Sequence, residues 1–579
     1  MQGDTPLGQS CAHCREHGKS ACKGCLLVVY CGPQCQKAHW CTHKQDCRSS
    51  LNKDNWKPEW ERQGRPPTFS SIGPSQQSFG RNKFFWGNVP AIDVLRMDQN
   101  EGEDCDKDIR LLFAASGDPR NVIQTIASVP QGYDQSLHAH INDKDFDIVA
   151  RNAIMLLVLL TVPDTDKAAE CVVHIWYSAC IRQTDLDILR DQVRPLVEDI
   201  CKKIVGKKVG TMLGKTWPFA NRALRLVLKK ELWTLLLDYL EVPKGLTAVL
   251  AQRIRVAVTL APSRKDYYER MLIKYPPAHR VCINKFRELG ILVPFGHRVQ
   301  LFDIPNPTFY QTDEWPMKDA ADPLDGWALG DILKVNTGPA ANDIYGKLFL
   351  HVRELVSSFH RRIESLNVSF ELSNCAAEDL SNQLSEGSFA RVEVSNICDR
   401  NYLGCAKTVA SLGPLLQRPH TNTHATLLML FMNAVPEMAA EFERAGHADT
   451  SAEMLKVSSH LGRTFQHTGS AYDSGLMGLV AARPIFRDVD KFFDTYMDVQ
   501  RFDMIQRYYA MTMKNTHTIV DKWPTMPKLR PGEVGARKEI DVLIRSAHSG
   551  NERYVEWRRA FSHNDSTGAT QLDGRTQQS

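Results

Sequence analysis

The chain has 579 residues, of which 43% are hydrophobic and 24% are charged, with 71 Lys plus Arg against 67 Asp plus Glu. These proportions are those of a folded globular protein, and they exclude a wholly disordered, collagen-like or coiled-coil chain. The length predicts about three or four domains. A net charge of +4 is not that of an obligate nucleic-acid binder.

The apolar segments do not suggest a membrane protein. The longest unbroken apolar stretch in a predicted helix is 153–160, whereas a bilayer-spanning helix needs about 20 residues. The first 25 residues contain no apolar core of a signal peptide. We therefore expect a soluble intracellular protein, located in the cytoplasm or the nucleus.

Half of the sixteen cysteines lie within residues 11–47, and the other eight are scattered singly from Cys105 to Cys405. In a reducing compartment, a dense cysteine cluster indicates metal binding rather than disulfides. The cluster contains four closely spaced pairs of donors: Cys11 and Cys14, Cys22 and Cys25, Cys31 and Cys35, and His43 and Cys47. Thiolate and imidazole donors in this number predict two closed tetrahedral sites holding two structural Zn²⁺ ions. Metal binding would fold this segment, which is too short to bury a core.

Spacing alone leaves the last ligands open. Cys35, His39, His43 and Cys47 recur every four residues and could share one face of a helix. Cys41 is a further candidate within the same stretch.

Residues 35–47, with the sequence CQKAHWCTHKQDC, resemble the closing signature of the MYND finger, and Tyr30 and Cys31 before them fit the same family. The resemblance covers 11–47 and implies interleaved zinc sites. One site would use Cys11, Cys14, Cys31 and Cys35, and the other would use Cys22, Cys25, His43 and Cys47. His39 and Cys41 would then be bystanders, and Trp40 would pack on the finger.

The same resemblance implies the kind of partner. MYND fingers mostly bind proteins, often through short proline-containing peptides, so we expect a protein partner and no membrane. Residues 1–50 carry six Lys or Arg against three Asp or Glu, which would also allow nucleic acid, but we favour a peptide.

After the finger, the sequence patterns predict an α/β domain interrupted by a long insertion. Residues 48–83 are rich in Pro, Gly and polar residues, which predicts a flexible linker, although Trp56 and Trp60 could dock locally. Short apolar runs alternate with helical patterns, which predicts a parallel sheet covered by helices. The predicted strands are 109–115, 137–141, 368–372, 390–394 and 425–431. The predicted helices include 146–160, 185–203, 217–239, 342–366 and 489–513.

These elements divide the rest of the chain into five predicted parts. They are the first part of the α/β domain at 84–165, a mostly helical insertion at 166–366, the second part of the α/β domain at 367–440, a helical C-terminal region at 441–561 and a disordered tail at 562–579.

One turn of the predicted sheet has the pattern of a cofactor site. Ser116, Gly117 and Asp118 follow the first strand, and Asp143 follows the second. Open α/β sheets bind ligands at such turns, and the pattern resembles the core of S-adenosylmethionine-dependent methyltransferases. The alternative, which we favour, is that Gly117 permits a tight turn while Asp118 and Asp143 cap the helices that follow. Neither catalytic nor cofactor-binding residues can be assigned from this pattern.

A longer resemblance runs from about 84 to 435. The stretches 84–95, 111–127, 141–157, 325–331 and 390–404 resemble a fungal family of MYND-linked proteins whose shared domain has no assigned function. That domain is similar to the N-terminal part of dynein axonemal assembly factor 3. The resemblance implies a methyltransferase-like fold and brings no catalytic residue with it.

We therefore expect an interaction or scaffold protein, whose finger recruits a partner peptide and whose body acts as an adaptor or assembly factor, and we do not favour an enzyme. The alternative is a divergent S-adenosylmethionine-dependent methyltransferase that uses the finger for substrate selection. His138 and His140 alternate on a predicted strand and share one face. With no third ligand near them, we predict core or surface histidines rather than a metal site.

Overall fold

The computed structural model describes residues 10–70, 78–446, 450–461, 470, 472–546 and 550–560. The predicted tail at 562–579 lies outside these residues, as does the part of the predicted linker at 71–77. No described helix combines the length and the hydropathy needed to cross a bilayer.

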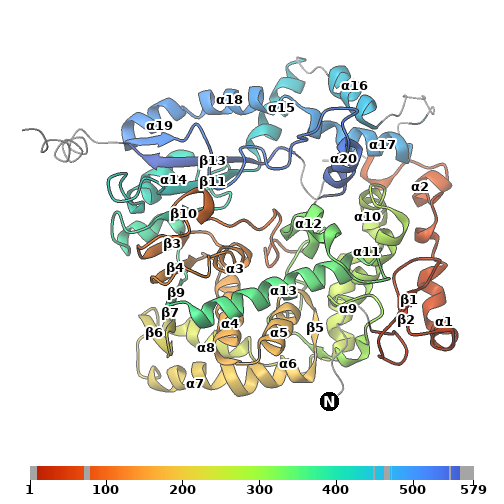
Figure 1. Cartoon of the computed structure of the whole chain (residues 1–579), viewed down its shortest axis with the longest axis horizontal. Coiled ribbons are helices and arrows are strands. Elements are labelled where there is room, and N and C mark those ends of the chain that lie inside the picture. Colours follow the sequence, from red (N-terminus) through yellow and green to blue (C-terminus); the bar gives the residue numbers. More distant parts are fainter. Residues whose placement is uncertain are drawn as a thin grey trace, which may run out of the picture.

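A nine-stranded sheet lies on one side of the molecule, and the cysteine-rich segment lies on the other side, beyond a group of helices (Figure 1). The strand order is β12-β13-β11-β10-β3-β4-β9-β7-β6. The six strands from β11 to β7 are parallel, and antiparallel strands extend the sheet at both edges. The strands are β3 Ile109–Phe113, β4 Leu137–Asn142, β6 Met212–Phe219, β7 Arg222–Lys229, β9 Val368–Ser373, β10 Arg391–Glu393, β11 Thr426–Phe431, β12 Met511–Met513 and β13 Arg553–Arg559. The predicted parallel sheet is therefore confirmed, as a mixed and mostly parallel sheet.

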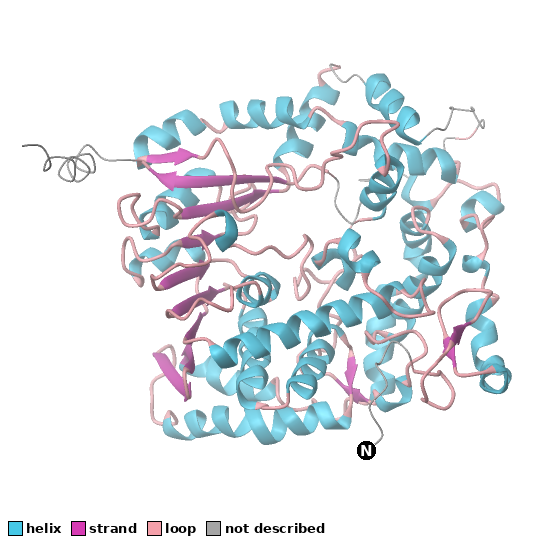
Figure 2. Cartoon of the chain, viewed as in Figure 1, coloured by secondary structure: helices cyan, strands magenta, loops and turns pink. Residues whose placement is uncertain are grey.

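Both faces of the sheet are covered, because alternate side chains of its central strands enter two different cores. Leu111 of β3 belongs to one buried cluster, and the next residue, Leu112, belongs to another. Leu428 and Leu427 of β11 are divided in the same way. Helices lie over the sheet and beside it (Figure 2).

Helices α3, α4, α5 and α13 supply the first cluster, and α14, α15, α18 and α19 supply the second. The helices of the first group are α3 Arg120–Ala127, α4 Phe146–Thr161, α5 Thr165–Tyr177 and α13 Ile344–Ser365. Those of the second are α14 Cys405–Leu412, α15 Ala434–Arg444, α18 Val489–Val499 and α19 Phe502–Tyr509.

Further helices lie below the β6 edge of the sheet, between the sheet and the cysteine-rich segment, beside that segment and along the C-terminal part of the chain. These are α2 Glu59–Arg62, α6 Gln183–Ile188, α7 Arg194–Lys203, α8 Lys230–Asp238, α9 Ala248–Thr259, α10 Lys265–Leu272, α11 Pro277–Leu289, α12 Leu329–Lys334, α16 Thr450–Leu461, α17 Ser474–Ala482 and α20 Ala536–Arg545. Two short strands, β5 Cys180–Ile181 and β8 Ile304–Pro305, pair separately from the large sheet.

The predicted helix at 217–239 is wrong over its first half. The chain there forms the hairpin of β6 and β7, and α8 begins only at Lys230. In β7, Leu224, Leu226 and Leu228 are buried at every second position, which is the period of a strand rather than of a helix. The insertion therefore contributes two strands to the large sheet.

The predicted helix at 489–513 is also interrupted. Arg501, which separates α18 from α19, has a φ of 55°, a left-handed conformation that a continuous helix does not contain. The segment ends in β12, which pairs with β13 at the edge of the sheet. The C-terminal region is thus part of the α/β sheet as well as helical.

The described part of the predicted linker is packed against the helices. The Trp60 side chain is fully buried, and its Nε1 donates a hydrogen bond to the Tyr472 carbonyl at 3.0 Å. Arg65 makes two hydrogen bonds to the Asp266 carboxylate, at 2.7 and 2.9 Å. This segment therefore differs from a free linker, because its tryptophan and arginine side chains have specific partners on the body.

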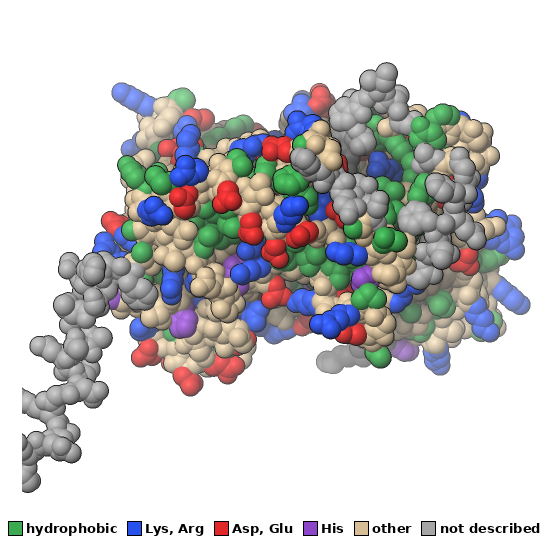
Figure 3. Space-filling view, turned by 90° about the horizontal axis from the view of Figure 1, so that it is seen from above, with side chains coloured by type: hydrophobic (Ala, Val, Ile, Leu, Met, Phe, Trp, Pro, Cys, Tyr) green, Lys and Arg blue, Asp and Glu red, His purple; other side chains and the backbone are tan. Residues whose placement is uncertain are grey.

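Positive and negative side chains are interspersed on the face seen from above in Figure 3, among scattered apolar ones. This face, as far as its residues are described, has no large area of a single charge sign. Its charge pattern is that of an ordinary solvated surface.

Candidate metal centre

The cysteine-rich segment consists of a hairpin of two short strands followed by one helix. Strands β1 (Ser20–Ala21) and β2 (Val29–Tyr30) pair antiparallel, and α1 (Pro33–Cys47) follows directly. Gly32 precedes α1, and Pro33 occupies its first turn, where the missing N–H of proline costs no helical hydrogen bond. Two donor pairs thus lie at turns, Cys31 directly follows β2, and Cys35, His43 and Cys47 lie on α1.

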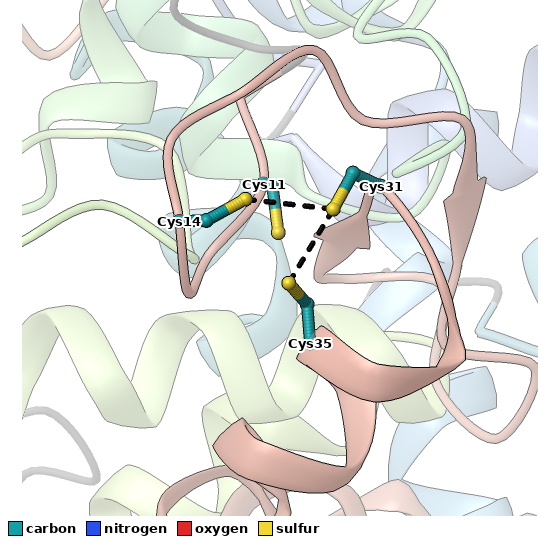
Figure 4. A group of neighbouring side chains, drawn as sticks. All are labelled: Cys11, Cys14, Cys31 and Cys35. Atoms are coloured by element: carbon teal, nitrogen blue, oxygen red, sulfur yellow. Dashed lines mark hydrogen bonds between the residues drawn. The ribbon is translucent and has the colours of Figure 1, made fainter.

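The first group of donors is made of four cysteines whose Sγ atoms converge on one point (Figure 4). The Sγ of Cys31 lies 3.4 Å from that of Cys14 and 3.4 Å from that of Cys35, and Cys11 completes the group. All four sulfur atoms lie within 4.8 Å of one another. Sulfur atoms bound to one tetrahedral Zn²⁺ at about 2.3 Å are about 3.8 Å apart, so this group fits zinc.

The second group contains three cysteines and one histidine. The Sγ atoms of Cys22 and Cys47 are 3.8 Å apart, and the Cys25 Sγ lies 3.4 Å from the His43 Nε2. The four donor atoms again lie within 4.8 Å of one another. Burial lowers the pKa of His43 to about 4, so its imidazole is neutral at pH 7 and carries a free lone pair. This set also suits zinc.

The two groups contain the same residues that the MYND resemblance implied. His39 and Cys41, which spacing alone left as possible ligands, belong to neither group. The His39 Nδ1 is 3.0 Å from the Tyr30 hydroxyl, away from both sets of donors. The Cys41 side chain is exposed. Trp40 contacts the His43 ring edge to face, with ring centroids 6.1 Å apart. His39 and Trp40 thus support the finger through aromatic contacts.

The finger is fixed to the body of the protein. Ala12, Leu27 and Val28 belong to the same buried cluster as one face of the sheet. The Asn342 side chain donates to the Cys25 carbonyl at 3.1 Å, and its backbone N–H donates to the Leu26 carbonyl at 3.2 Å. These contacts hold the second group of donors directly against the loop before α13.

Comparison with known proteins supports this description of the finger. The family model described as the MYND finger matches residues 11–47, and the predicted finger is thereby confirmed. The chain therefore contains a MYND zinc finger with one group of four cysteines and one group of three cysteines and a histidine, the donor set of two structural zinc ions.

A second model, described as a domain of unknown function (DUF4470), matches residues 85–181. Dynein axonemal assembly factor 3 of Danio rerio is 29% identical over 102 residues, which is 17% of this chain and 21% of that protein. The similarity thus spans about a fifth of the relative's length. No solved structure matches the chain significantly.

The turn predicted as a possible cofactor site is occupied by contacts within the chain. Gly117 has a φ of 55°, which allows the tight turn, and its N–H donates to Asp143 at 3.0 Å. The other oxygen of Asp143 accepts from the Asp145 N–H at 2.9 Å. Asp118 accepts a hydrogen bond from the Gly87 N–H at 2.8 Å and forms a buried ion pair with Arg120. The tight turn predicted at Gly117 is therefore confirmed. The predicted caps are wrong, because no described side chain caps α3 and the N-cap of α4 is Asp145 rather than Asp143.

A third group of donors lies on the sheet, away from the finger. His138 and His140 of β4 lie beside Glu371 of β9. No local pattern points to Glu371, because it lies more than 200 residues beyond the histidines and approaches them only through strand pairing. A third candidate donor therefore lies near the two histidines, contrary to the premise of the sequence-based interpretation, while their assignment as core or surface histidines stays a prediction.

Proposed function

We propose that the protein is an interaction adaptor or assembly factor, whose MYND finger recruits a partner peptide and whose α/β body positions that partner. We further propose that Cys11, Cys14, Cys31 and Cys35 bind one structural zinc ion, and that Cys22, Cys25, His43 and Cys47 bind the other. The observation that carries the proposal is the exposed side of α1. One side of this helix faces the zinc groups, and the other remains free for a partner.

The exposed side follows the helical repeat. Gln34, Lys37 or Ala38, Cys41 and Gln45 follow one another at intervals of three or four residues, and all five side chains are exposed. His43, one of the proposed ligands, is buried on the opposite side. A structural zinc site requires only the inner side, so the outer side is available for binding.

The charge of this surface indicates the chemistry of the peptide. Lys37 and Lys44 are exposed on α1, and no acidic residue lies among the five positions of the outer side. We expect a proline-containing peptide with acidic residues beside the proline. The name of the Danio rerio relative describes an assembly factor, which agrees with an adaptor role.

The test is a titration of labelled proline-containing peptides, with and without flanking acidic residues, into the zinc-loaded full chain. Fluorescence anisotropy gives the affinity. The Lys37→Glu variant should weaken binding of the acidic peptide at least tenfold. Lys202→Glu on α7, an exposed lysine far from the finger, should bind like the parent. Equal affinity of the parent and the Lys37→Glu variant would contradict the proposed surface.

A second candidate function is that of a divergent S-adenosylmethionine-dependent methyltransferase. It is favoured by the strand order, which proceeds from β3 to β4 and β9 on one side and from β10 to β11 on the other. Ligands of open α/β sheets bind at such a reversal, beyond the carboxyl ends of the strands. The antiparallel strand β13 beside β11 also resembles the methyltransferase arrangement. This candidate is the weaker one, because the carboxylates of Asp143 and Asp118 already bind groups of the chain itself rather than facing an open cofactor site.

Isothermal titration of S-adenosylmethionine into the zinc-loaded protein tests the second candidate. Saturable binding that is lost in the Asp143→Ala variant would favour the enzyme. Absence of binding at millimolar ligand would leave the adaptor as the function.

A further inference from the structure

The third group of donors is created by the pairing of two parallel strands. His140 of β4 lies opposite Glu371 of β9 in the register of the sheet. His138 lies two residues before His140, so its side chain is on the same face. The donor atoms of the three side chains all lie within 4.8 Å of one another.

The distances are slightly longer than those around a bound ion. The Glu371 Oε2 lies 3.9 Å from the His138 Nε2 and 3.9 Å from the His140 Nδ1. Nitrogen and oxygen ligands of one tetrahedral Zn²⁺, bound at about 2.0–2.1 Å, are separated by about 3.3 Å. A small inward rotation of the side chains would therefore bring all three donors to one metal ion.

The hydrogen bonds around His140 fix its protonation pattern. The Asn142 amide nitrogen donates to the Ala114 and Cys375 carbonyls, so the Asn142 Oδ1 is an acceptor. The Ser373 hydroxyl donates to this oxygen at 2.9 Å. Because its only hydrogen is used there, the Ser373 Oγ accepts at its 2.9 Å contact with the His140 Nε2. The neutral His140 ring thus carries its proton on Nε2 and a lone pair on Nδ1.

This lone pair points toward a carboxylate. The His140 Nδ1 and the His138 Nε2 are buried, and neither has a hydrogen-bond partner among the described residues. Only 4% of the His140 side chain is exposed. Two acceptors, a ring nitrogen and a carboxylate oxygen, do not stabilise each other unless a cation or a donor lies between them.

The surroundings resemble the outer shell of a metal site. Ser373 orients His140, Ser369 lies 2.9 Å from the His138 Nδ1, and Arg225 donates to the second oxygen of Glu371 at 3.2 Å. Metal ligands are commonly held by hydrogen bonds of this kind. The site is also reachable, since 18% of the His138 side chain and 25% of the Glu371 side chain are exposed.

We propose that His138, His140 and Glu371 bind a divalent first-row transition-metal ion. Two imidazoles and one carboxylate form the donor set of open Zn²⁺ or Fe²⁺ sites, in which three protein ligands leave a position for water or another ligand. Arg225 at the same face would favour an anionic ligand in that position. This site is of a different type from the finger, whose two groups have four ligands each.

Isothermal titration of Zn²⁺ into the full chain tests the proposal, after the two finger sites have been loaded with zinc. The parent should bind one further ion. The isosteric Glu371→Gln variant should bind it at least tenfold more weakly, because it removes the charge of the carboxylate. Glu378→Gln, an exposed site just beyond β9, should behave like the parent.

His138→Gln is a second variant. It replaces the more exposed of the two histidines, so that folding is preserved, and its affinity for the third Zn²⁺ ion should also fall at least tenfold. Thermal unfolding followed by circular dichroism checks that both variants are folded. Absence of a third ion in the parent, or unchanged affinity in both folded variants, would overturn the metal site and favour a bridging water.

Discussion

Glu393, the last residue of β10, is a buried carboxyl group that should make stability depend on pH. Burial raises its pKa from 4.5 to about 7, even though Oε1 accepts a hydrogen bond from the Ser395 N–H at 2.7 Å. The folded state therefore keeps its proton at pH values where the unfolded chain has lost it. The resulting stabilisation is complete below about pH 4.5 and is lost as the pH rises through 7. Its size is about 3 kcal/mol, from 1.36 kcal/mol per pKa unit.

The Glu393→Gln variant should remove this dependence, because glutamine keeps the acceptor oxygen and cannot ionise. We expect the variant to be more stable than the parent at pH 8 and to lose that advantage near pH 5. Urea unfolding of both proteins across this range measures the difference. Burial also raises the pKa values of Asp343 and Asp399, to about 6. Because both residues titrate in the parent and in the variant, their contributions to the difference in stability cancel. A constant difference between pH 5 and pH 8 would contradict the raised pKa.

Cys47 and Cys41 lie on the same helix but should respond differently to replacement by serine. Cys47→Ser removes a donor from the second group, so the protein should retain one zinc ion fewer per chain than the parent after washing with a chelator. Cys41→Ser alters an exposed side chain outside both groups and should retain the full zinc content. Mass-spectrometric metal analysis measures both. Equal zinc content in the parent and the Cys47→Ser variant would remove Cys47 from the ligands.

At the level of single residues, the sequence predicted those candidate ligands that lie close together along the chain. The donors of the finger lie within 37 residues, and pairs such as Cys22 and Cys25 indicate a metal site, whereas the division into two groups came from the MYND resemblance. Glu371 could not be predicted in the same way, since its position beside His140 depends on the register of two strands far apart in the chain. The tautomer of His140 depends likewise on Ser373 and Asn142 from those two strands.

Among the elements, α2 and the segment around it show how the finger is joined to the body. Trp60 is fully buried, so Trp60→Ala should destabilise this segment by about 3–5 kcal/mol. Thermolysin should then cut residues 48–70 in the variant much faster than in the parent. Lys57→Ala changes a side chain that is 55% exposed and should leave the cleavage rate near that of the parent. Rapid cleavage of the parent in this segment would favour a flexible linker.

The strands also show where sequence patterns are ambiguous. β3 is predicted well because it belongs to a short apolar run that ends in a turn, and β4 because Leu137, Ala139 and Ile141 recur at every second position. The hairpin of β6 and β7 was predicted as a helix, because its edge strand β6 is largely exposed and carries no regular apolar pattern. The alternation of Leu224, Leu226 and Leu228 in β7 is a local strand signal, whereas the pairing of β7 with β9, which stabilises the hairpin, could not be predicted from the sequence.

At the scale of the whole molecule, the finger packs directly against the α/β body, and the two are not separate domains joined only by a flexible linker. The finger shares a buried cluster with the sheet, and Lys285 of α11 forms an ion pair with Asp46 of α1 at 3.3 Å. A partner bound to the outer side of α1 would therefore be held at a fixed position relative to the body. The order of the sheet strands, the docking of the finger and the group on β4 and β9 all depend on long-range contacts, which a single sequence does not reveal.

The most direct measurement is titration of the native protein with an organic mercurial, which displaces zinc from thiolates, while an indicator dye records the zinc released. Two ions released per chain are expected, because the two groups of the finger contain seven cysteines and one histidine. An ion held by His138, His140 and Glu371 has no thiolate ligand and should not be released by the mercurial. Release of fewer than two ions per chain would mean that the finger is incomplete, and recruitment of a partner through a zinc-folded α1 would be contradicted.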